Sequence, residues 1–422
     1  MKSLAVMLVL ALFNLEECIQ YAVQSNPEMA SARIEAEKSR AMLNSSRLEY
    51  LPSLNLYLNQ YFNWGRSVDM QELLIIRNRL TKQSGASVGT SFTIFDGMRR
   101  VNGTARGKEL LQSAVWAGRA LEMEITEEVT RAYLECLLAR ELKESLEEIH
   151  SRTLEKAGVV EALCESGMAT RSTMLEIRAQ AASEEADIVQ AAGDEQNAKQ
   201  RLAALMGYEA GGPPFEIEGI DTDCLADKAP VTVELIPEHS PGIIALEHEI
   251  SACEYGVKEA KGLLLPSVVL TGAYGTYYSD LSPDIFRNQI RDNGNPSLTV
   301  SVSLPLFAGG AAAREISTAG STLKEARARL RKTLLDMENT LDAAGRECEA
   351  LRRKATACLE YRRMCREKEA VAEEEFAEGA ISASEYIDAR KEMIQSDREY
   401  ICSLYRYLFQ QKTIEHYNSY GK

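Results

Sequence analysis

The sequence predicts a mixed α+β membrane protein with a duplicated unit, each copy combining a β-hairpin with long antiparallel coiled-coil helices. Three observations support this fold class: recurring landmarks, four segments with period-two alternation, and two helical runs of nearly seventy residues. The landmarks recur at a nearly constant offset, a little over two hundred positions, which indicates duplication of a whole supersecondary unit. They are Pro52 and Pro266, Phe95 and Phe307, and Gly167 and Gly379.

Four segments alternate apolar and polar residues with a period of two, which is typical of strands with one apolar and one wet face. The fourth is the cleanest, since Leu298, Val300 and Val302 alternate with serine and threonine. Consecutive strands form hairpins, whose long polar loops at 65–84 and 279–296 lie on the same side. The expected strands cover about 53–63, 86–95, 267–278 and 297–307.

Each predicted strand is about nine to eleven residues long, the length of a tilted strand that crosses a bilayer. Two groups of aromatic residues near the strand ends suit an aromatic girdle. They are Tyr57, Tyr61, Phe62 and Trp64 in the first hairpin, and Tyr274, Tyr277 and Tyr278 in the second. A small soluble sheet with one solvated face is the commoner alternative. Because a barrel needs about eight strands, the membrane interpretation requires several chains to share one barrel.

A helical run without proline follows each β-hairpin and would extend on the order of 100 Å. Each run meets a glycine, after which a second helical run returns, and apolar residues recur at the three- and four-residue spacing of antiparallel coiled coils. Pro27 and Pro241 are each expected to separate a short helix from a longer one. The expected boundaries are a signal-like apolar segment at 1–13, a first repeat at 14–210 with its helical hairpin at about 98–207, a linker or equatorial segment at 211–230, and a second repeat at 231–422 with its helical hairpin at about 310–410.

Composition argues against several classes of protein. The net charge of −15 over 422 residues disfavours a general nucleic-acid surface. No apolar stretch reaches the roughly 18 residues of a membrane-spanning helix. Lys2, followed by the uncharged residues 4–13, fits an export signal, although no small-residue cleavage site follows. The alternative for this run is the hydrophobic first turn of a helix.

The sequence lacks the patterns of an enzyme. The four histidines have no metal-ligand spacing, the nine cysteines include no CxxC pair, and neither a phosphate loop nor a serine elbow is present. Carboxylates are abundant, but nearly all lie on predicted helix faces, as in a solvated surface. We therefore expect no catalytic residue, no metal site and no cofactor.

Several short motifs together resemble TolC-like outer-membrane efflux proteins, also called outer membrane factors. They are Leu15-Glu16-Glu17-Cys18 with Ala22 and Asn26-Pro27, the pair Leu51-Pro52-Ser53 and Leu265-Pro266-Ser267, and the pair Phe95-Asp96-Gly97 and Phe307-Ala308-Gly309. The resemblance covers almost the whole chain in the right order. It marks Pro52, Gly97, Pro266 and Gly309 as the strand–helix junctions.

The resemblance implies a homotrimer in the outer membrane of a Gram-negative bacterium. Four strands from each chain would form a twelve-stranded β-barrel, continuous with an α-helical barrel in the periplasm. The implied function is the passive exit duct of a tripartite efflux or type I secretion system. The implied partners are a periplasmic adaptor, an inner-membrane pump of the RND, ABC or MFS type, and outer-membrane lipid, with no nucleic acid.

In that family the turns between the long helices form the periplasmic entrance, and acidic residues beyond the second turn favour cations. Gly167 and Gly379 match the turns, and Glu385 and Asp388 match the acidic positions. In the first copy Thr173 and Glu176 occupy those positions. Ordinary exposed helix carboxylates are the alternative interpretation of the acidic pair.

Two gate positions depart from the family pattern. Phe376 replaces a gate tyrosine, so the hydroxyl is lost, and Ile381 replaces a gate arginine and cannot form an ion pair. We therefore expect the closed state to be held differently, or more weakly, than in the family.

Two other functions fit part of the pattern. A periplasmic adaptor also combines a helical hairpin with β structure, but it carries one hairpin and no whole-chain duplication. A cytosolic coiled-coil scaffold would leave the four amphipathic strands without explanation. The duplication and the strands together favour the duct over both.

Overall fold

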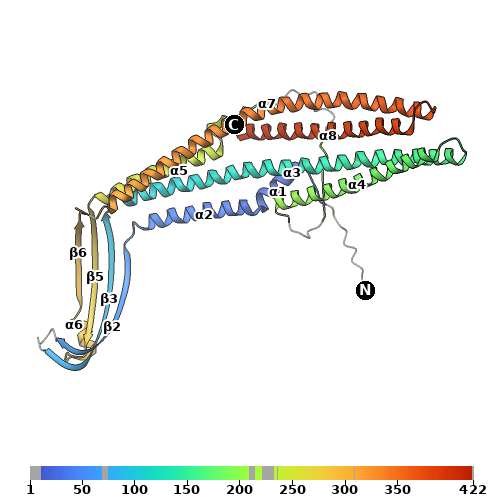
Figure 1. The fold of residues 1–422 in the computed structure, drawn as a ribbon. Helices are drawn as coiled ribbons and strands as arrows, with labels where there is room; N and C mark the ends of the chain where they lie inside the picture. Colours follow the sequence, from blue (N-terminus) through green and yellow to red (C-terminus); the bar gives the residue numbers. More distant parts are fainter. Residues whose placement is uncertain are drawn as a thin grey trace, which may run out of the picture. The chain divides into compact units, whose positions relative to one another are not determined.

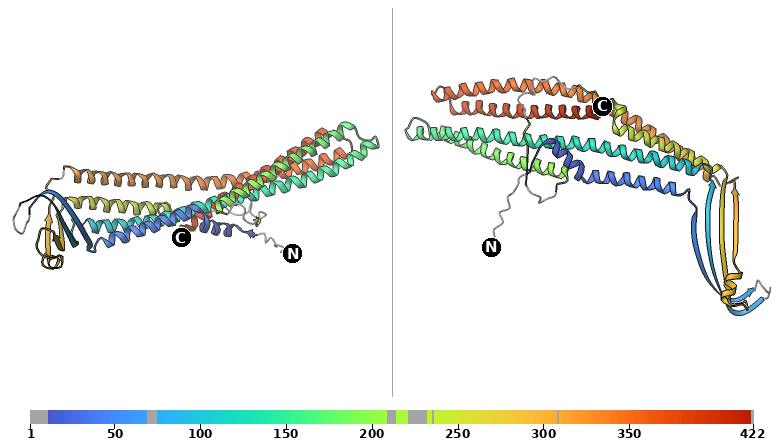
Figure 2. Two further views of the ribbon diagram at one scale, coloured as in Figure 1. Left: turned by 90° about the horizontal axis from the view of Figure 1, so that it is seen from below. Right: turned by 180° about the vertical axis from the view of Figure 1, so that it is seen from behind.

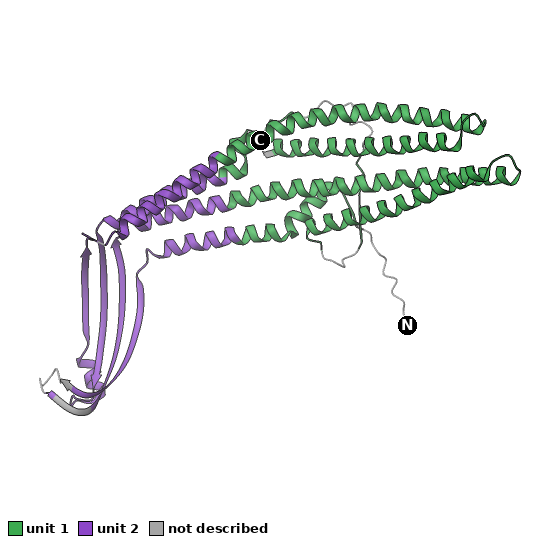
Figure 3. Ribbon diagram, viewed as in Figure 1, with its two compact units in different colours: residues 1–34, 115–244, 332–422 green, residues 35–114, 245–331 purple. Residues whose placement is uncertain are grey.

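The computed structural model describes residues 11–68, 75–208, 214–220, 232–234, 236–307 and 309–420. The chain forms two compact units, shown in Figure 3, and each unit draws on both predicted repeats. The two compact units therefore do not correspond to the two sequence repeats. Unit 1 comprises Met1–Ile34, Val115–Ile244 and Lys332–Lys422, and unit 2 comprises Glu35–Ala114 and Ala245–Arg331.

Helices make up most of the described chain (Figure 1). The predicted break at Pro27 is confirmed, since it separates α1 from α2, whereas the segment before Pro241 is only a 3-10 turn at Pro237–His239. The final helix continues well beyond the predicted end at 410. The helices are α1 (Leu15–Ser25), α2 (Pro27–Leu48), α3 (Arg99–Glu165), α4 (Arg171–Met206), α5 (Pro241–Lys261), α6 (Phe286–Asp292), α7 (Ala311–Ala377) and α8 (Ala383–Tyr420).

Unit 2 contains an antiparallel sheet in the order β2-β3-β5-β6, so β2 and β6 form its two edges. Its strands are β2 (Ser53–Val68), β3 (Ile75–Phe95), β5 (Ser267–Ser279) and β6 (Asn295–Ser303). The predicted loop at 65–84 is largely wrong, because β2 and β3 stay paired well into it. This stretch lacks clean apolar alternation, which is the signal that identified the other strands.

The fourth strand ends at Ser303 and not at the predicted residue 307. Pro305 explains the difference, since proline has no N–H to donate to a strand ladder. The predicted loop at 279–296 also contains a short helix, α6. Both corrections concern the ends of the second β-hairpin.

The register places the apolar residues on one surface of the sheet, which we call the apolar face, and most of its side chains are exposed. Its members are Leu54, Leu56, Leu58, Phe62, Trp64, Val88, Phe92, Leu270, Tyr274, Leu298, Val300 and Val302. The opposite polar face carries serine, threonine, asparagine and glycine. The expected girdle therefore divides: Phe62, Trp64, Tyr274 and Tyr278 lie on the apolar face, whereas Tyr57, Tyr61 and Tyr277 lie on the polar face.

A second, two-stranded sheet was not predicted. β1 (Ala11–Phe13) pairs in parallel with β4 (Phe215–Ile217). Ala11–Phe13 thus belong to the folded structure, although the sequence interpretation assigned them to the signal-like segment at 1–13; residues 1–10 lie outside the described residues. β4 likewise lies inside the segment interpreted as a linker, most of which is not described.

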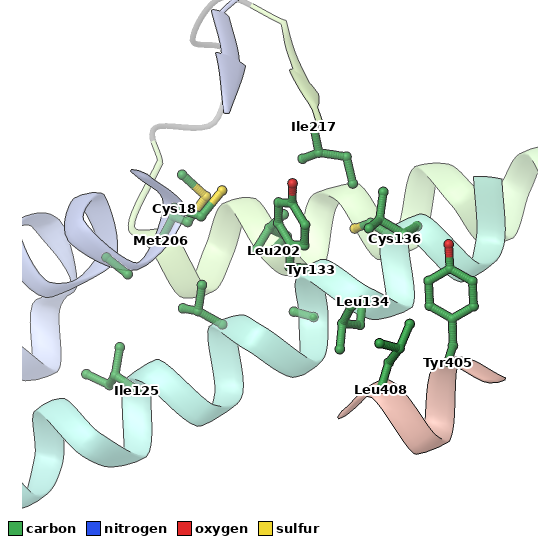
Figure 4. Packing of buried hydrophobic residues seen from close by; sticks show 14 of the residues in the cluster. Cys18, Ile125, Tyr133, Leu134, Cys136, Leu202, Met206, Ile217, Tyr405 and Leu408 are labelled. Atoms are coloured by element: carbon green, nitrogen blue, oxygen red, sulfur yellow. The ribbon is translucent and has the colours of Figure 1, made fainter. Parts of the chain in front are cut away.

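The main core of unit 1 gathers residues of α1, α4, β4 and α8 around α3, as Figure 4 shows. Tyr133 of α3 is 1% exposed, and its hydroxyl donates a hydrogen bond to the Glu218 carbonyl at 2.6 Å. Because α1, α4, β4 and α8 all pack here, the core ties the two halves of the chain together. The buried contributors include Cys18, Ile125, Leu134, Leu202, Met206, Ile217 and Leu408.

Within unit 1, α3 runs beside α4 and α7 runs beside α8, as the views of Figures 1 and 2 agree. The long helices α3 and α7 have 67 residues each. Across the described residues, no helix combines the length and the apolarity that a membrane crossing requires.

Candidate functional site at the ends of the helical hairpins

Both hairpins close through the same backbone turn. Gly167 and Gly379 adopt left-handed φ values of 78° and 76°, which glycine reaches without steric cost. The amide of Met168 donates to the Leu163 carbonyl at 2.8 Å, and the amide of Ala380 donates to the Glu375 carbonyl at the same distance. The two turns occupy equivalent positions of the two copies, so the backbone turn recurs at the spacing that the sequence predicted.

The caps after the turns differ in charge. In the first hairpin, the hydroxyl of Thr170 accepts from the Thr173 amide at 3.2 Å. In the second, a carboxylate oxygen of Glu385 accepts from the amide and the hydroxyl of Ser382, at 2.8 and 2.9 Å, while the Glu385 amide donates to that hydroxyl. This is a capping box with an ionised member.

Glu385 therefore has a structural task that the sequence interpretation did not give it. The hydrogen bonds from the Ser382 amide, and then from its hydroxyl, hold the pKa of the Glu385 carboxyl below its ordinary value of 4.5. The side chain remains exposed. Asp388 lies one helical turn further on, also exposed, and it forms no ion pair with the described residues. Both carboxylates are thus exposed to solvent, Glu385 while engaged in the cap.

Phe376 and Ile381 do not face solvent as a polar gate pair would. They pack against a buried cluster that joins the two hairpins near their turns, with Val160 and Ile177 from the first hairpin. The other buried members come from α7 and α8: Ala372, Tyr386, Ile387 and Ala389. Ile381 therefore contributes apolar contact to this cluster.

A tyrosine that the sequence interpretation missed supplies the hydroxyl that Phe376 lacks. The ring of Tyr386 is stacked on that of Phe376, with centroids 5.3 Å apart and planes 12° apart. The Tyr386 hydroxyl accepts from Lys156 of α3 and, at 3.2 Å, from Arg390 of α8. Lys156 also pairs with Glu373 of α7 at 2.8 Å. This polar link therefore connects the two hairpins beside the apolar cluster.

Arg390 is a deeply buried charge of the site, with 2% of its surface exposed. Its guanidinium donates to the Ile149 carbonyl at 2.7 Å and to the Thr153 hydroxyl at 2.6 Å, both on α3. It also lies 3.5 Å from Glu184 of α4 and 3.1 Å from Glu369 of α7. One side chain of α8 therefore contacts all three other helices.

The sequence held a signal for Arg390. Tyr386, Arg390, Met393 and Asp397 follow one another at three- and four-residue spacing on α8, in a row that continues with Ile401. An arginine inside an otherwise apolar coiled-coil seam indicates a buried charge with a dedicated partner. The sequence interpretation treated the carboxylates of these helices as a solvated surface, and it singled out neither Arg390 nor its buried partner Glu184.

Among the four junction residues the two prolines occupy equivalent places, whereas the two glycines differ in how closely they are packed. Pro52 and Pro266 each stand one residue before a strand, at the starts of β2 and β5. Gly97 is buried with φ of 72°, and a Cβ there would collide with the Gly262 carbonyl oxygen. Gly309 also has a positive φ, of 57°, but nothing lies within 4 Å of its Cβ position. Ala308, the residue before Gly309, lies outside the described residues.

Comparison with known proteins identifies the family. The sequence model described as "Outer membrane efflux protein" matches residues 18–208 and 233–417. The outer membrane protein OprJ of Pseudomonas aeruginosa is 23% identical over 406 residues, covering 92% of this chain and 80% of OprJ. The crystal structure of CusC superposes with a TM-score of 0.82 at 18% identity, covering 96% of this chain and 92% of CusC. The CmeC outer membrane channel of Campylobacter jejuni gives 0.83 at 15% identity, covering 96% and 86%.

The chain belongs to the outer membrane efflux protein family, since the family match spans most of its length. It is an outer-membrane protein that serves as an exit duct of an efflux system. The predicted family, the mixed α+β fold of the single chain and the class of function are confirmed, and the adaptor and scaffold alternatives are set aside.

Proposed function

We propose that three copies of this chain form one duct, in which the sheets of unit 2 close a shared barrel. The supporting observation is the sheet itself: most side chains of its apolar face are exposed, and its edge strands β2 and β6 each lack a second neighbour among the described strands. Exposed strand edges and exposed leucines are unfavourable in water. Pairing β6 of one chain with β2 of the next would satisfy both edges and turn the apolar face to lipid.

The duct conducts cargo passively and performs no bond chemistry. A periplasmic adaptor and an inner-membrane pump, of the RND, ABC or MFS type, would deliver cargo to the ends of the helical hairpins. The two repeats, 14–210 and 231–422, each contribute one β-hairpin and one helical hairpin, and the two segments of the family match support this division. Type I secretion of proteins is the alternative use of the same duct.

The closed entrance is held within each chain by the link between its two hairpins. Phe376, Ile381 and Tyr386 contribute the apolar part, and Arg390 contributes the buried polar part. Opening requires α7 and α8 to move away from α3 and α4, which would break these contacts. Because Arg390 is shielded from solvent, dissolved salt screens its interactions little.

Trimer formation is tested by gel migration of the purified protein without and with heating. We expect a heat-sensitive band at three times the mass of the 46.8 kDa chain. Replacing outward residues of the edge strand, as in Val300→Asp with Val302→Asp, should abolish that band, because charge on the lipid face is costly. A wild-type protein that migrates as a monomer in detergent and also fails to conduct in planar bilayers would refute the duct.

The role of the acidic pair is tested by ion selectivity in planar bilayers. Threefold symmetry would gather the copies of Asp388 around one axis, where they attract cations. We expect Asp388→Ala to lower the cation-to-anion permeability ratio several-fold. The matched control is Glu176→Ala, at the equivalent position of the first copy, which should leave the ratio near the wild-type value. An unchanged ratio in Asp388→Ala removes the assignment of this residue.

A further inference from the structure

The segment that joins β5 to β6, residues 280–294, folds back onto the sheet. We call it the return segment; α6 lies within it. Gln289 is only 3% exposed, and its amide group accepts from the Ser279 amide at 2.9 Å and donates to the Ser279 and Asp284 carbonyls at 3.1 and 2.7 Å. Asn293 donates to the Tyr277 carbonyl at 2.8 Å. These contacts fasten α6 to the outer end of β5, beyond the last residue paired with β6.

The return segment lies on the apolar face. The Thr276 hydroxyl donates to the Ile290 carbonyl at 2.7 Å, and the ring of Tyr278 lies 5.2 Å from that of Phe286. Thr276 pairs with Ala86, which is in register with Leu58 of the apolar face. Since side chains aligned across a ladder share a face, α6 covers the outer end of the surface that would meet lipid.

Two apolar side chains of the return segment are largely exposed. Ile285 is 65% exposed and Phe286 is 58% exposed. The next residue, Arg287, is also exposed and has no ion pair within the described part of the chain. Apolar side chains next to a free cation on a short helix are typical of elements that lie in a membrane interface.

The length of β5 places α6 at the boundary of the apolar band. Val268, which pairs with Val302 of the apolar face, and Tyr278 lie on the same side of β5, at opposite ends of this strand. At about 3.4 Å per residue their separation is about 34 Å of strand, and a tilt of about 40° reduces it to about 26 Å. The apolar band of such barrels is about 25 Å tall. Phe62 and Trp64 of β2 lie near the same level, since Gln60, Ser84 and Tyr278 are in register.

We propose that the return segment is an interfacial anchor, with Ile285 and Phe286 inserted at the border between lipid headgroups and acyl chains and Arg287 directed to the headgroups. The anchor rests on the proposed function, since only a sheet in a membrane brings lipid to this face. Its apolar side chains continue the apolar face beyond β5, and this continuity argues for lipid as the occupant.

The test is tryptophan fluorescence quenching in phosphatidylcholine vesicles whose acyl chains carry bromine at different depths. Phe286→Trp is built in a Trp64→Phe, Trp116→Phe background, because the chain has only these two tryptophans. We expect the tryptophan at position 286 to lose more fluorescence with bromine near the headgroups than with bromine near the chain ends. Leu56→Trp, on the middle of the apolar face, should show the reverse order. Tyr277→Trp, on the polar face, should be quenched by neither lipid.

The outcomes separate the anchor from the duct. If Leu56→Trp is quenched and Phe286→Trp is not, the anchor is wrong and the duct stands. If Phe286→Trp is quenched most by bromine near the chain ends, α6 is not interfacial and the anchor is also wrong. If neither variant is quenched, the sheet is not in the membrane and the proposed function fails with it.

Discussion

At the end of the first helical hairpin, Gly167 closes the turn and Arg178 lies on the following helix, exposed and paired with Glu161 of the same hairpin. In the second hairpin, Gly379 closes the same turn, but Arg390, the counterpart of Arg178, is buried and reaches the other hairpin. Any tight connection between antiparallel helices needs a left-handed residue, so both copies keep glycine. The side chains are not constrained in this way, and only the second copy uses this arginine to join the hairpins.

The largest difference in the free energy of unfolding is expected between Arg390→Met and its counterpart Arg178→Met. Arg390→Met leaves the carboxylates of Glu184 and Glu369 without their buried partner and should cost about 3–5 kcal/mol. Arg178→Met changes an exposed pair and should cost less than about 0.5 kcal/mol. Thermal unfolding followed by circular dichroism compares the two. In planar bilayers Arg390→Met should also raise the conductance of the closed state; equal effects of the two variants would remove the asymmetry.

A smaller difference in the free energy of unfolding is expected between Phe376→Ala and Cys164→Ala. These two residues occupy equivalent positions in the two copies. Phe376→Ala removes the ring stacked on Tyr386 and opens the apolar cluster, which should cost about 2 kcal/mol. Cys164→Ala removes one half-buried sulfur and should cost less than about 1 kcal/mol. The same unfolding measurement applies. Phe376→Tyr, which keeps the ring, is the control and should stay near wild type.

At the backbone turn, by contrast, we expect the same substitution to lower the free energy of unfolding equally in the two hairpins. Gly167→Ala and Gly379→Ala should each cost about 1–2 kcal/mol, because an L-residue is strained at positive φ. At both positions nothing lies within 4 Å of the Cβ site, so no steric clash adds to the backbone strain. Measured losses that differ clearly between the two would show that the turns are not equivalent.

The smallest effect concerns pH and the charged cap. The pKa of Glu385 is depressed in the folded state, so its stabilising effect is present above the ordinary value of 4.5 and is lost as pH falls through the folded-state pKa. The gap in unfolding temperature between wild type and Glu385→Gln should therefore close below about pH 4.5. Thr173→Val, the counterpart in the uncharged cap, removes the hydroxyl that lies 3.0 Å from the Thr170 hydroxyl. It should lower the unfolding temperature by an amount that does not change with pH. A gap for Glu385→Gln that persists at low pH would contradict the capping role.

Much of the fold was predictable because it depends on short-range periodicity. Period-two alternation located the four strands of the large sheet, and proline and glycine marked the helix boundaries. The outer ends of β2 and β3 were missed, because their sequence carries no clean period-two alternation. The strand pair β1 and β4 was missed because each has only three residues and their pairing joins segments far apart in the sequence.

The sequence predicted where the candidate site lies along the chain, but it did not predict the side-chain contacts within the site. The recurring spacing located the turns at Gly167 and Gly379, and the family resemblance located Glu385 and Asp388 near the second turn. That Glu385 belongs to a cap, and that Tyr386 supplies a hydroxyl beside Phe376, depends on side-chain geometry. The same holds for Arg390, whose partners on α3 and α4 belong to the other copy of the duplicated unit.

The sequence alone determined that the chain is duplicated, that its strands have one apolar and one wet face, and that its helices pair as long hairpins. These properties are local: they follow from which residue types repeat every two or every three to four positions. Only the tertiary structure decided that the compact units cut across the repeats and that the return segment covers the apolar face. It also decided that the buried arginine joining the hairpins comes from the second copy alone. Those outcomes depend on contacts between residues distant in the chain, and on the burial that gives a charge such as Arg390 a required partner.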